Sequence, residues 1–295
     1  MSDARILDRG YRRYDGPRLG VSASVRSLAV QTVQRALGLR RSPWSKVIPF
    51  GTVAIAYLPA VVFVGASVFF GDAISRAGGI RLPSYGQYYG FVSAAIFVFA
   101  AFVAPEVLCT DRKTGMLGLY LASPLTRDTY LLGKLLAVLG VLALVTLGPP
   151  LFMLVAYTVN GRGPDGLVEW VTVFARMVVA GLAVALAAAL LSLAISSLTT
   201  RKAVAAAGVI FVLAGSAGVS DALIRSGGAS PNLFLVDLVQ LPLELVFRIY
   251  GEPFHVDSPA AAQVGTGTLA AAYVAWCAVF AGIVWLRYRR LVVTK

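Results

Sequence analysis

Six long apolar runs constrain this chain more than any other feature of its sequence. Each is close to the roughly 20 residues that a helix needs to cross a hydrocarbon core of about 30 Å. Only 14% of the residues are charged, whereas about a quarter are charged in a soluble domain. The sequence therefore predicts an all-α membrane protein with six transmembrane helices, at about residues 47–70, 85–108, 135–157, 168–198, 203–220 and 265–286.

Basic residues gather beside the ends of these runs. Ten of the 26 Lys and Arg residues lie within residues 1–46, four within 109–134 and four after Trp285. An excess of Lys and Arg on one side of the membrane is the positive-inside pattern, so both termini are expected in the cytoplasm. Membrane topology explains the net charge of +12 better than nucleic-acid binding does. The basic clusters also favour contact with anionic membrane lipids.

The chain divides into a basic N-terminal region, residues 1–46, and one six-span domain, residues 47–295. Within the first region, apolar residues recur every three or four positions from Val21 to Leu37, which predicts an amphipathic helix at the membrane interface. The longest stretch outside the spans, residues 221–264, has the opposite charge bias. Its segment PNLFLVDLVQLPLELVFRIY predicts two short interfacial or re-entrant helices on the outer side, divided by Pro242.

Enzymatic chemistry has little support in the sequence. His255 is the only histidine, and Cys109 and Cys277 do not have the spacing of metal ligands. The pair Gly133-Lys134 lacks the other residues of a phosphate-binding loop. We therefore expect no catalytic residue, no metal site and no bound cofactor, so that any ATP and Mg²⁺ would be used by a partner chain.

Two ionisable residues fall within apolar runs, where an ionisable group is costly and often functional. Glu106 has two interpretations, a structural role in which it pairs with Arg112, Lys113 or a partner subunit, and a direct role in transport. Arg176 has two as well, because its side chain either reaches outward to the interface or faces a polar path in an oligomer.

The segment between the second and third runs resembles one known family. Pro105-Glu106 is followed by DRKTG at 111–115, LASPLTR at 121–127 and YLLGK at 130–134. This order is similar to that of ABC-2-type transporter permeases of bacteria. The resemblance covers residues 21–290, and it implies a permease that dimerises and binds two copies of a separate ATPase subunit in the bacterial plasma membrane.

The resemblance also implies that residues 109–134 contain a coupling helix that inserts into the ATPase. Apolar side chains with a charged rim suit a protein–protein contact, although the same side chains could merely cover the bilayer surface. The residues expected to carry coupling are Arg112, Lys113, Thr114, Gly115, Met116, Leu117, Tyr120, Pro124 and Leu125.

The predicted function is the permease subunit of an ATP-driven exporter, with no ATPase site of its own. Mostly apolar spans favour a hydrophobic or amphipathic substrate. Two alternatives stay open: a secondary transporter or channel that works without ATP, and a membrane scaffold protein that binds partners through its basic arm.

Overall fold

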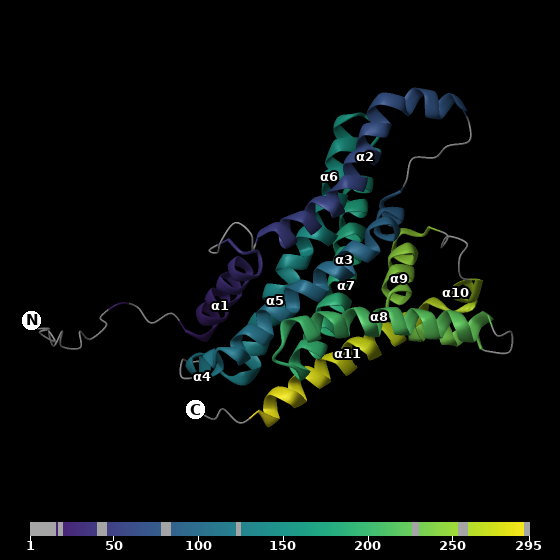
Figure 1. Cartoon of the computed structure of the whole chain (residues 1–295). Coiled ribbons are helices and arrows are strands. Elements are labelled where there is room, and N and C mark those ends of the chain that lie inside the picture. The colour runs from purple at the N-terminus through teal and green to yellow at the C-terminus, as the bar shows by residue number, and fades with distance from the viewer. Residues whose placement is uncertain are drawn as a thin grey trace, which may run out of the picture.

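The computed structural model describes residues 16, 20–39, 46–77, 84–121, 125–225, 230–252 and 259–291, with the backbone alone for residues 48 and 71–77. Every regular element in these ranges is a helix (Figure 1). The elements are α1 Val21–Ala36, α2 Val47–Ala77, α3 Tyr85–Lys113, α4 Met116–Leu121, α5 Arg127–Thr146, α6 Gly148–Val159, α7 Gly166–Leu198, α8 Lys202–Arg225, the 3-10 helix η2 Pro231–Val236, α9 Gln240–Tyr250, α10 Pro259–Gln263 and α11 Thr266–Arg290.

Six stretches of helix in the described part of the chain are long and apolar enough to cross a membrane. They lie on α2, α3, α5 with α6, α7, α8 and α11, which confirms the six predicted spans. The third span breaks at Leu147, between α5 and α6. Pro149 and Pro150 follow the break in the first turn of α6, where a missing N–H costs no helical hydrogen bond.

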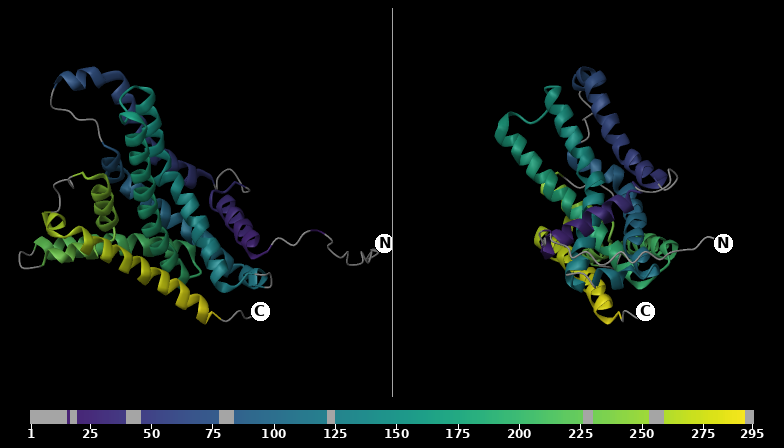
Figure 2. Two further views of the ribbon diagram at one scale, coloured as in Figure 1. Left: turned by 180° about the vertical axis from the view of Figure 1, so that it is seen from behind. Right: turned by 90° about the vertical axis from the view of Figure 1, so that its left-hand side faces the viewer.

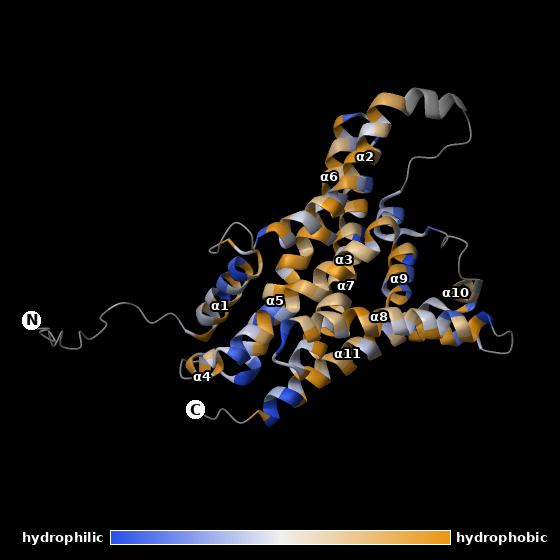
Figure 3. Ribbon diagram, viewed as in Figure 1, coloured by the Kyte–Doolittle hydropathy of each residue, from blue (hydrophilic) through white to orange (hydrophobic). Residues whose placement is uncertain are grey.

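The core of the bundle is formed mainly by α3 and α7, the two spans with the largest buried share. Helix α7 packs against α3, α5, α8, α9 and α11. Helices α2 and α11 are the least buried spans, and α2 packs with α6 in an arm that reaches away from α8 and α10 (Figure 2). Apolar residues cover the spans, and hydrophilic residues gather at α1, the start of α5 and the end of α11 (Figure 3).

The predicted amphipathic helix is α1, and it lies along α5 and beside the end of α3. Its buried residues are Leu28, Thr32 and Ala36. A Cβ atom on Gly133 of α5 would lie 3.0 Å from the Leu28 side chain, so the glycine lets the two helices approach closely. We refer to this end of the bundle, where α1, α4 and the end of α11 lie, as the α4 end.

The segment between the fifth and sixth spans folds into η2, α9 and α10. Its division was predicted at Pro242, and this was wrong, because Pro242 lies in the first turn of α9. The division falls instead at Asp237, whose Oδ1 atom accepts hydrogen bonds from the backbone N–H groups of Val239 and Gln240, each at 2.9 Å. Proline is tolerated in a first turn because the N–H groups there have no helical partner. Burial raises the pKa of the Asp237 carboxyl.

Candidate coupling site

The predicted coupling residues form a hairpin between α3 and α5 at the α4 end. Helix α3 ends at Lys113, and Thr114 caps it by donating its backbone N–H to the Thr110 carbonyl at 3.0 Å. Gly115 then turns the chain with a φ of +68°, a conformation that favours glycine. The short helix α4 follows, and Thr126 starts α5 through a reciprocal capping interaction with Thr129. Pro124 lies outside the described residues.

Helix α4 presents two different faces. Leu117 and Tyr120, three residues apart, pack against the core of the bundle, and Leu125 beyond the helix is buried. Leu119 points the other way and is 67% exposed, while Met116 is half-buried. The apolar side chains of this segment therefore serve two purposes, since some anchor the hairpin and Leu119 remains available at its surface.

A buried charge cluster lies directly beneath this hairpin. The Asp111 carboxylate, with an exposure of 0%, is 2.6 Å from Lys134 Nζ and 2.7 Å from Arg35 Nη2. The Tyr130 hydroxyl donates to the same carboxylate at 2.9 Å, and Lys134 also donates to Thr32 Oγ1 at 3.1 Å. Buried charges are tolerated when they are paired and hydrogen-bonded. We name the five residues Arg35, Thr32, Asp111, Tyr130 and Lys134 the Asp111 cluster.

Sequence reasoning missed this cluster. The position of Lys134 beside a span suggested a charge set by topology alone, yet its side chain is only 1% exposed. The available signal was the occurrence of one acid, Asp111, and two bases, Arg35 and Lys134, at helix positions that border apolar residues. Their partnership depends on three helices meeting, which no local pattern reveals.

Two arginines tie the hairpin to other spans. Arg112 donates to the carbonyls of Ser197 and Thr199 at the end of α7, at 2.6 and 3.2 Å. Arg127 donates to the carbonyls of Tyr288 and Arg289 near the end of α11, at 3.2 and 2.6 Å. The last carbonyls of a helix lack helical partners and carry partial negative charge, so cations stabilise them.

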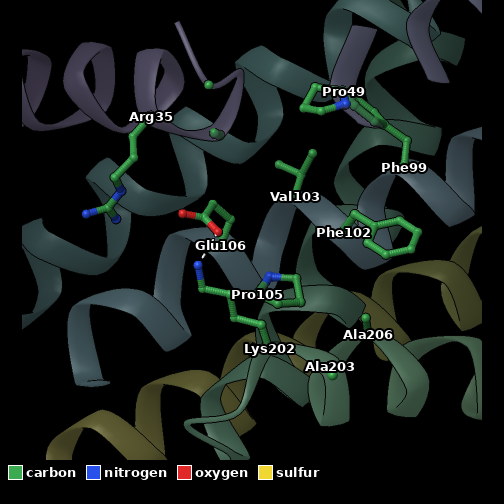
Figure 4. A pocket seen from close by; sticks show the side chains of 12 residues that line it. Arg35, Pro49, Phe99, Phe102, Val103, Pro105, Glu106, Lys202, Ala203 and Ala206 are labelled. Carbon is green, nitrogen blue, oxygen red and sulfur yellow. Dashed lines mark hydrogen bonds and ion pairs between the residues drawn. The ribbon is translucent and has the colours of Figure 1, made fainter. Parts of the chain in front are cut away.

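Glu106 of α3 pairs with Lys202, the first residue of α8. Arg112, one of the partners suggested for Glu106, is instead turned toward the end of α7. Glu106 and Lys202 line a cavity of about 260 Å³, and Arg35 lies at its side (Figure 4). Its other walls are apolar, formed by side chains that include Pro49, Phe99, Phe102, Val103, Pro105, Ala203 and Ala206.

Arg176 lies far from this site, in the first half of α7. Its Nη1 atom donates to the carbonyl of Tyr250 at 3.3 Å. Tyr250 is the last residue of α9, so Arg176 interacts with the end of a helix much as Arg112 does. The side chain thus holds α9 to α7.

The family profile described as ABC-2 family transporter protein matches residues 21–291. No curated protein matches the chain. The matched region begins at the first residue of α1 and ends one residue beyond α11, so it contains the whole six-span bundle together with its hairpin and outer helices. The chain belongs to the ABC-2 family of transporter proteins.

Proposed function

We propose that this chain is the permease subunit of an ATP-driven exporter in a bacterial plasma membrane. Family membership supports a transporter membrane subunit that works with an ABC ATPase. In the proposal two ATPase subunits hold ATP and Mg²⁺, and a second permease protomer, either a copy of this chain or a sister subunit, completes the transporter. The α4 end and both termini face the cytoplasm, in keeping with the basic residues at that end.

The observation that carries the proposal is the set of polar links between the α3–α4–α5 hairpin and the rest of the bundle. Asp111 and Lys134 link it to α1, Arg112 links it to α7, and Arg127 links it to α11. A displacement of α4 would consequently move three other helices. This is the mechanical property that a coupling element requires, since a ligand must shift a connected set of packed elements to act at a distance.

The surface of α4 is suited to the ATPase contact. Leu119 is exposed, and the exposed Lys113 lies at the preceding end of α3. An apolar anchor surrounded by polar residues is the usual composition of a protein–protein contact. The movement that follows ATP binding would then reach the cavity beside Glu106 and Lys202, whose apolar walls and charged edge fit a hydrophobic or amphipathic substrate.

The direct test is Leu119→Asp, measured by co-purification with the ATPase encoded beside this chain and by the ATPase rate of the complex in vesicles. We expect at least a tenfold weaker association, about 1.4 kcal/mol, because a charge would replace an exposed apolar contact. Folding should be retained because Leu119 is 67% exposed and is not among the buried residues of the core. Val236→Asp is the matched control, because Val236 is also an exposed apolar residue and lies in η2, outside the membrane spans.

Unchanged association and ATPase rate in Leu119→Asp would exclude α4 as the contact. Transport by the purified chain in vesicles without ATP, driven by an ion gradient, would support the secondary transporter instead. A chain that binds partners through its basic arm and transports nothing under either condition would be a scaffold.

A further inference from the structure

A second hollow, separate from the cavity beside Glu106 and Lys202, is a groove between α5 and α11 at the α4 end. Its volume is about 480 Å³, within the range of about 300–1,000 Å³ common for small-molecule sites. Helices α5 and α11 form its walls, and α3 and α7 form its floor. Most of its lining is apolar, and the principal residues are Leu108, Leu131, Leu135, Leu190, Leu193 and Trp285.

The level of the groove within the membrane follows from the positions of its lining residues along their helices. Leu131 is in the second turn of α5, and Trp285 is five residues before the end of α11. Trp285 donates its Nε1–H to Asp128 Oδ1 at 3.1 Å, and tryptophan prefers the level of the lipid head groups. The groove therefore opens into the half of the bilayer next to the α4 end, where an acyl chain has access.

One exposed basic side chain, Arg289, lies beside the mouth of the groove. Helix α11 ends with Arg287, Arg289 and Arg290, all of which are exposed. The Arg289 guanidinium lies 4.2 Å from the centre of the Trp285 ring, directly beside the groove. Asp128 is the single carboxylate among the described lining residues, and it already accepts the tryptophan N–H.

We propose that this groove is a binding site for an anionic phospholipid of the adjacent leaflet. One acyl chain lies along the leucines between α5 and α11, and the phosphate lies against Arg289. The charge of Arg289 favours an anionic over a zwitterionic head group. Because the lipid contacts both helices that Arg127 joins, it would hold the start of α5 to the end of α11. The inference does not depend on the ATP-driven function proposed above.

The test uses the natural fluorescence of Trp285. The full chain carrying Trp44→Phe, Trp170→Phe and Trp276→Phe retains one tryptophan, which lines the groove. It is reconstituted in phosphatidylcholine vesicles to which acyl-brominated phosphatidylglycerol or acyl-brominated phosphatidylcholine is added at equal mole fractions. We expect the brominated phosphatidylglycerol to quench Trp285 at a several-fold lower mole fraction.

Two variants in this background separate a site from general contact with lipid. Gly282 lines the groove, and no atom lies within 4 Å of a Cβ atom placed on it. Gly282→Leu should therefore be accommodated, fill the groove and abolish the preference. Gly215→Leu on α8 is the control, because no atom lies within 4 Å of a Cβ atom added there either. This variant should retain the preference for the anionic lipid. Arg289→Gln should weaken the preference roughly fivefold. Equal quenching by the two lipids, or a preference that survives Gly282→Leu, would overturn the proposal.

Discussion

Asp111 organises the α4 end at the scale of single residues. Its two carboxylate oxygens face Arg35 on one side and Lys134 on the other, and Arg35 also donates to the Val107 carbonyl at 3.2 Å. The Lys134 ammonium lies 5.4 Å from the centres of the Tyr120 and Tyr130 rings, which add a favourable cation–π contact. One carboxylate therefore allows a buried lysine to sit between three helices.

Replacing Asp111 by asparagine should destabilise the protein strongly. The substitution leaves the Lys134 charge buried without its counter-ion, and loss of one partner of a buried pair costs about 3–5 kcal/mol. We expect a clear fall in the melting temperature of the purified chain in detergent. Asp221→Asn is the control, because its pair with Arg225 is 60–79% exposed and should contribute less than about 1 kcal/mol.

The double variant Asp111→Leu with Lys134→Met distinguishes a pair from two separate packing residues. Replacing both Asp111 and Lys134 by apolar residues removes the buried lysine charge along with its counter-ion, which is often neutral or stabilising. Arg35 is 23% exposed and keeps its hydrogen bond to the Val107 carbonyl. The double variant should thus melt above the single variant Asp111→Asn. If the two substitutions instead add their separate costs, the ion pair is not what holds these side chains in place.

The sequence reveals which residues of this end are charged but not which of them meet. Arg112 and Ser197 are 85 positions apart, and Lys134 and Thr32 are 102 positions apart. Such partnerships arise when helices pack, and helical periodicity contains no information on which helices do so. For this reason the predicted coupling residues include Arg112 but not Asp111, although Asp111 opens the DRKTG motif on which the resemblance depends.

At the scale of elements, hydropathy locates the spans well and their ends less well. The third span was predicted to begin near residue 135, whereas α5 begins at Arg127. Its first two turns carry polar residues and the Thr126 cap, so they belong to the helix without belonging to the apolar run. Helix α3 likewise continues past its predicted end at residue 108 to Lys113. The number and order of spans follow from the sequence because only long apolar helices satisfy the backbone in lipid.

The break between α5 and α6 depends on a close contact with α7. A Cβ atom on Gly181 would lie 3.0 Å from the Thr146 carbonyl oxygen and would overlap the Leu147 side chain. Gly181→Ala should therefore separate these helices and destabilise the protein by about 1–3 kcal/mol, despite the better helix propensity of alanine.

Thermal melting with Gly215→Ala as the control measures this effect. Gly215 is also inside a membrane helix, but nothing lies within 4 Å of an added Cβ atom there. The control should melt at or above the parent temperature. Equal melting of the two variants would mean that α7 has room to move away from Leu147 at little cost.

At the scale of the whole molecule, both ends of the bundle are closed by polar contacts between helices. At the end opposite α4, Ser84 donates to Glu252 Oε2 at 2.5 Å, and Arg248 joins Glu244, Ala261 and Thr266. Burial raises the pKa of the Glu244 carboxyl, although Arg248 acts against this. Between these ends the spans meet mainly through apolar contacts. Tyrosine hydroxyls add hydrogen bonds between spans, such as Tyr89 to the Thr146 carbonyl and Tyr273 to the Ala183 carbonyl, each at 2.8 Å.

The Glu106–Lys202 pair is the link that should separate when α8 moves relative to α3. Lys202 is 43% exposed and Glu106 is 18% exposed, so the pair contributes little to stability but affects the position of α8. We expect Glu106→Gln to leave the melting temperature nearly unchanged and to speed hydrogen exchange at the start of α8. The charge-swapped variant, Glu106→Lys with Lys202→Glu, restores the attraction and should return the rate of hydrogen exchange toward that of the parent. Fast hydrogen exchange in the charge-swapped variant would show that Glu106 acts through the shape of the cavity and not through its pairing with Lys202.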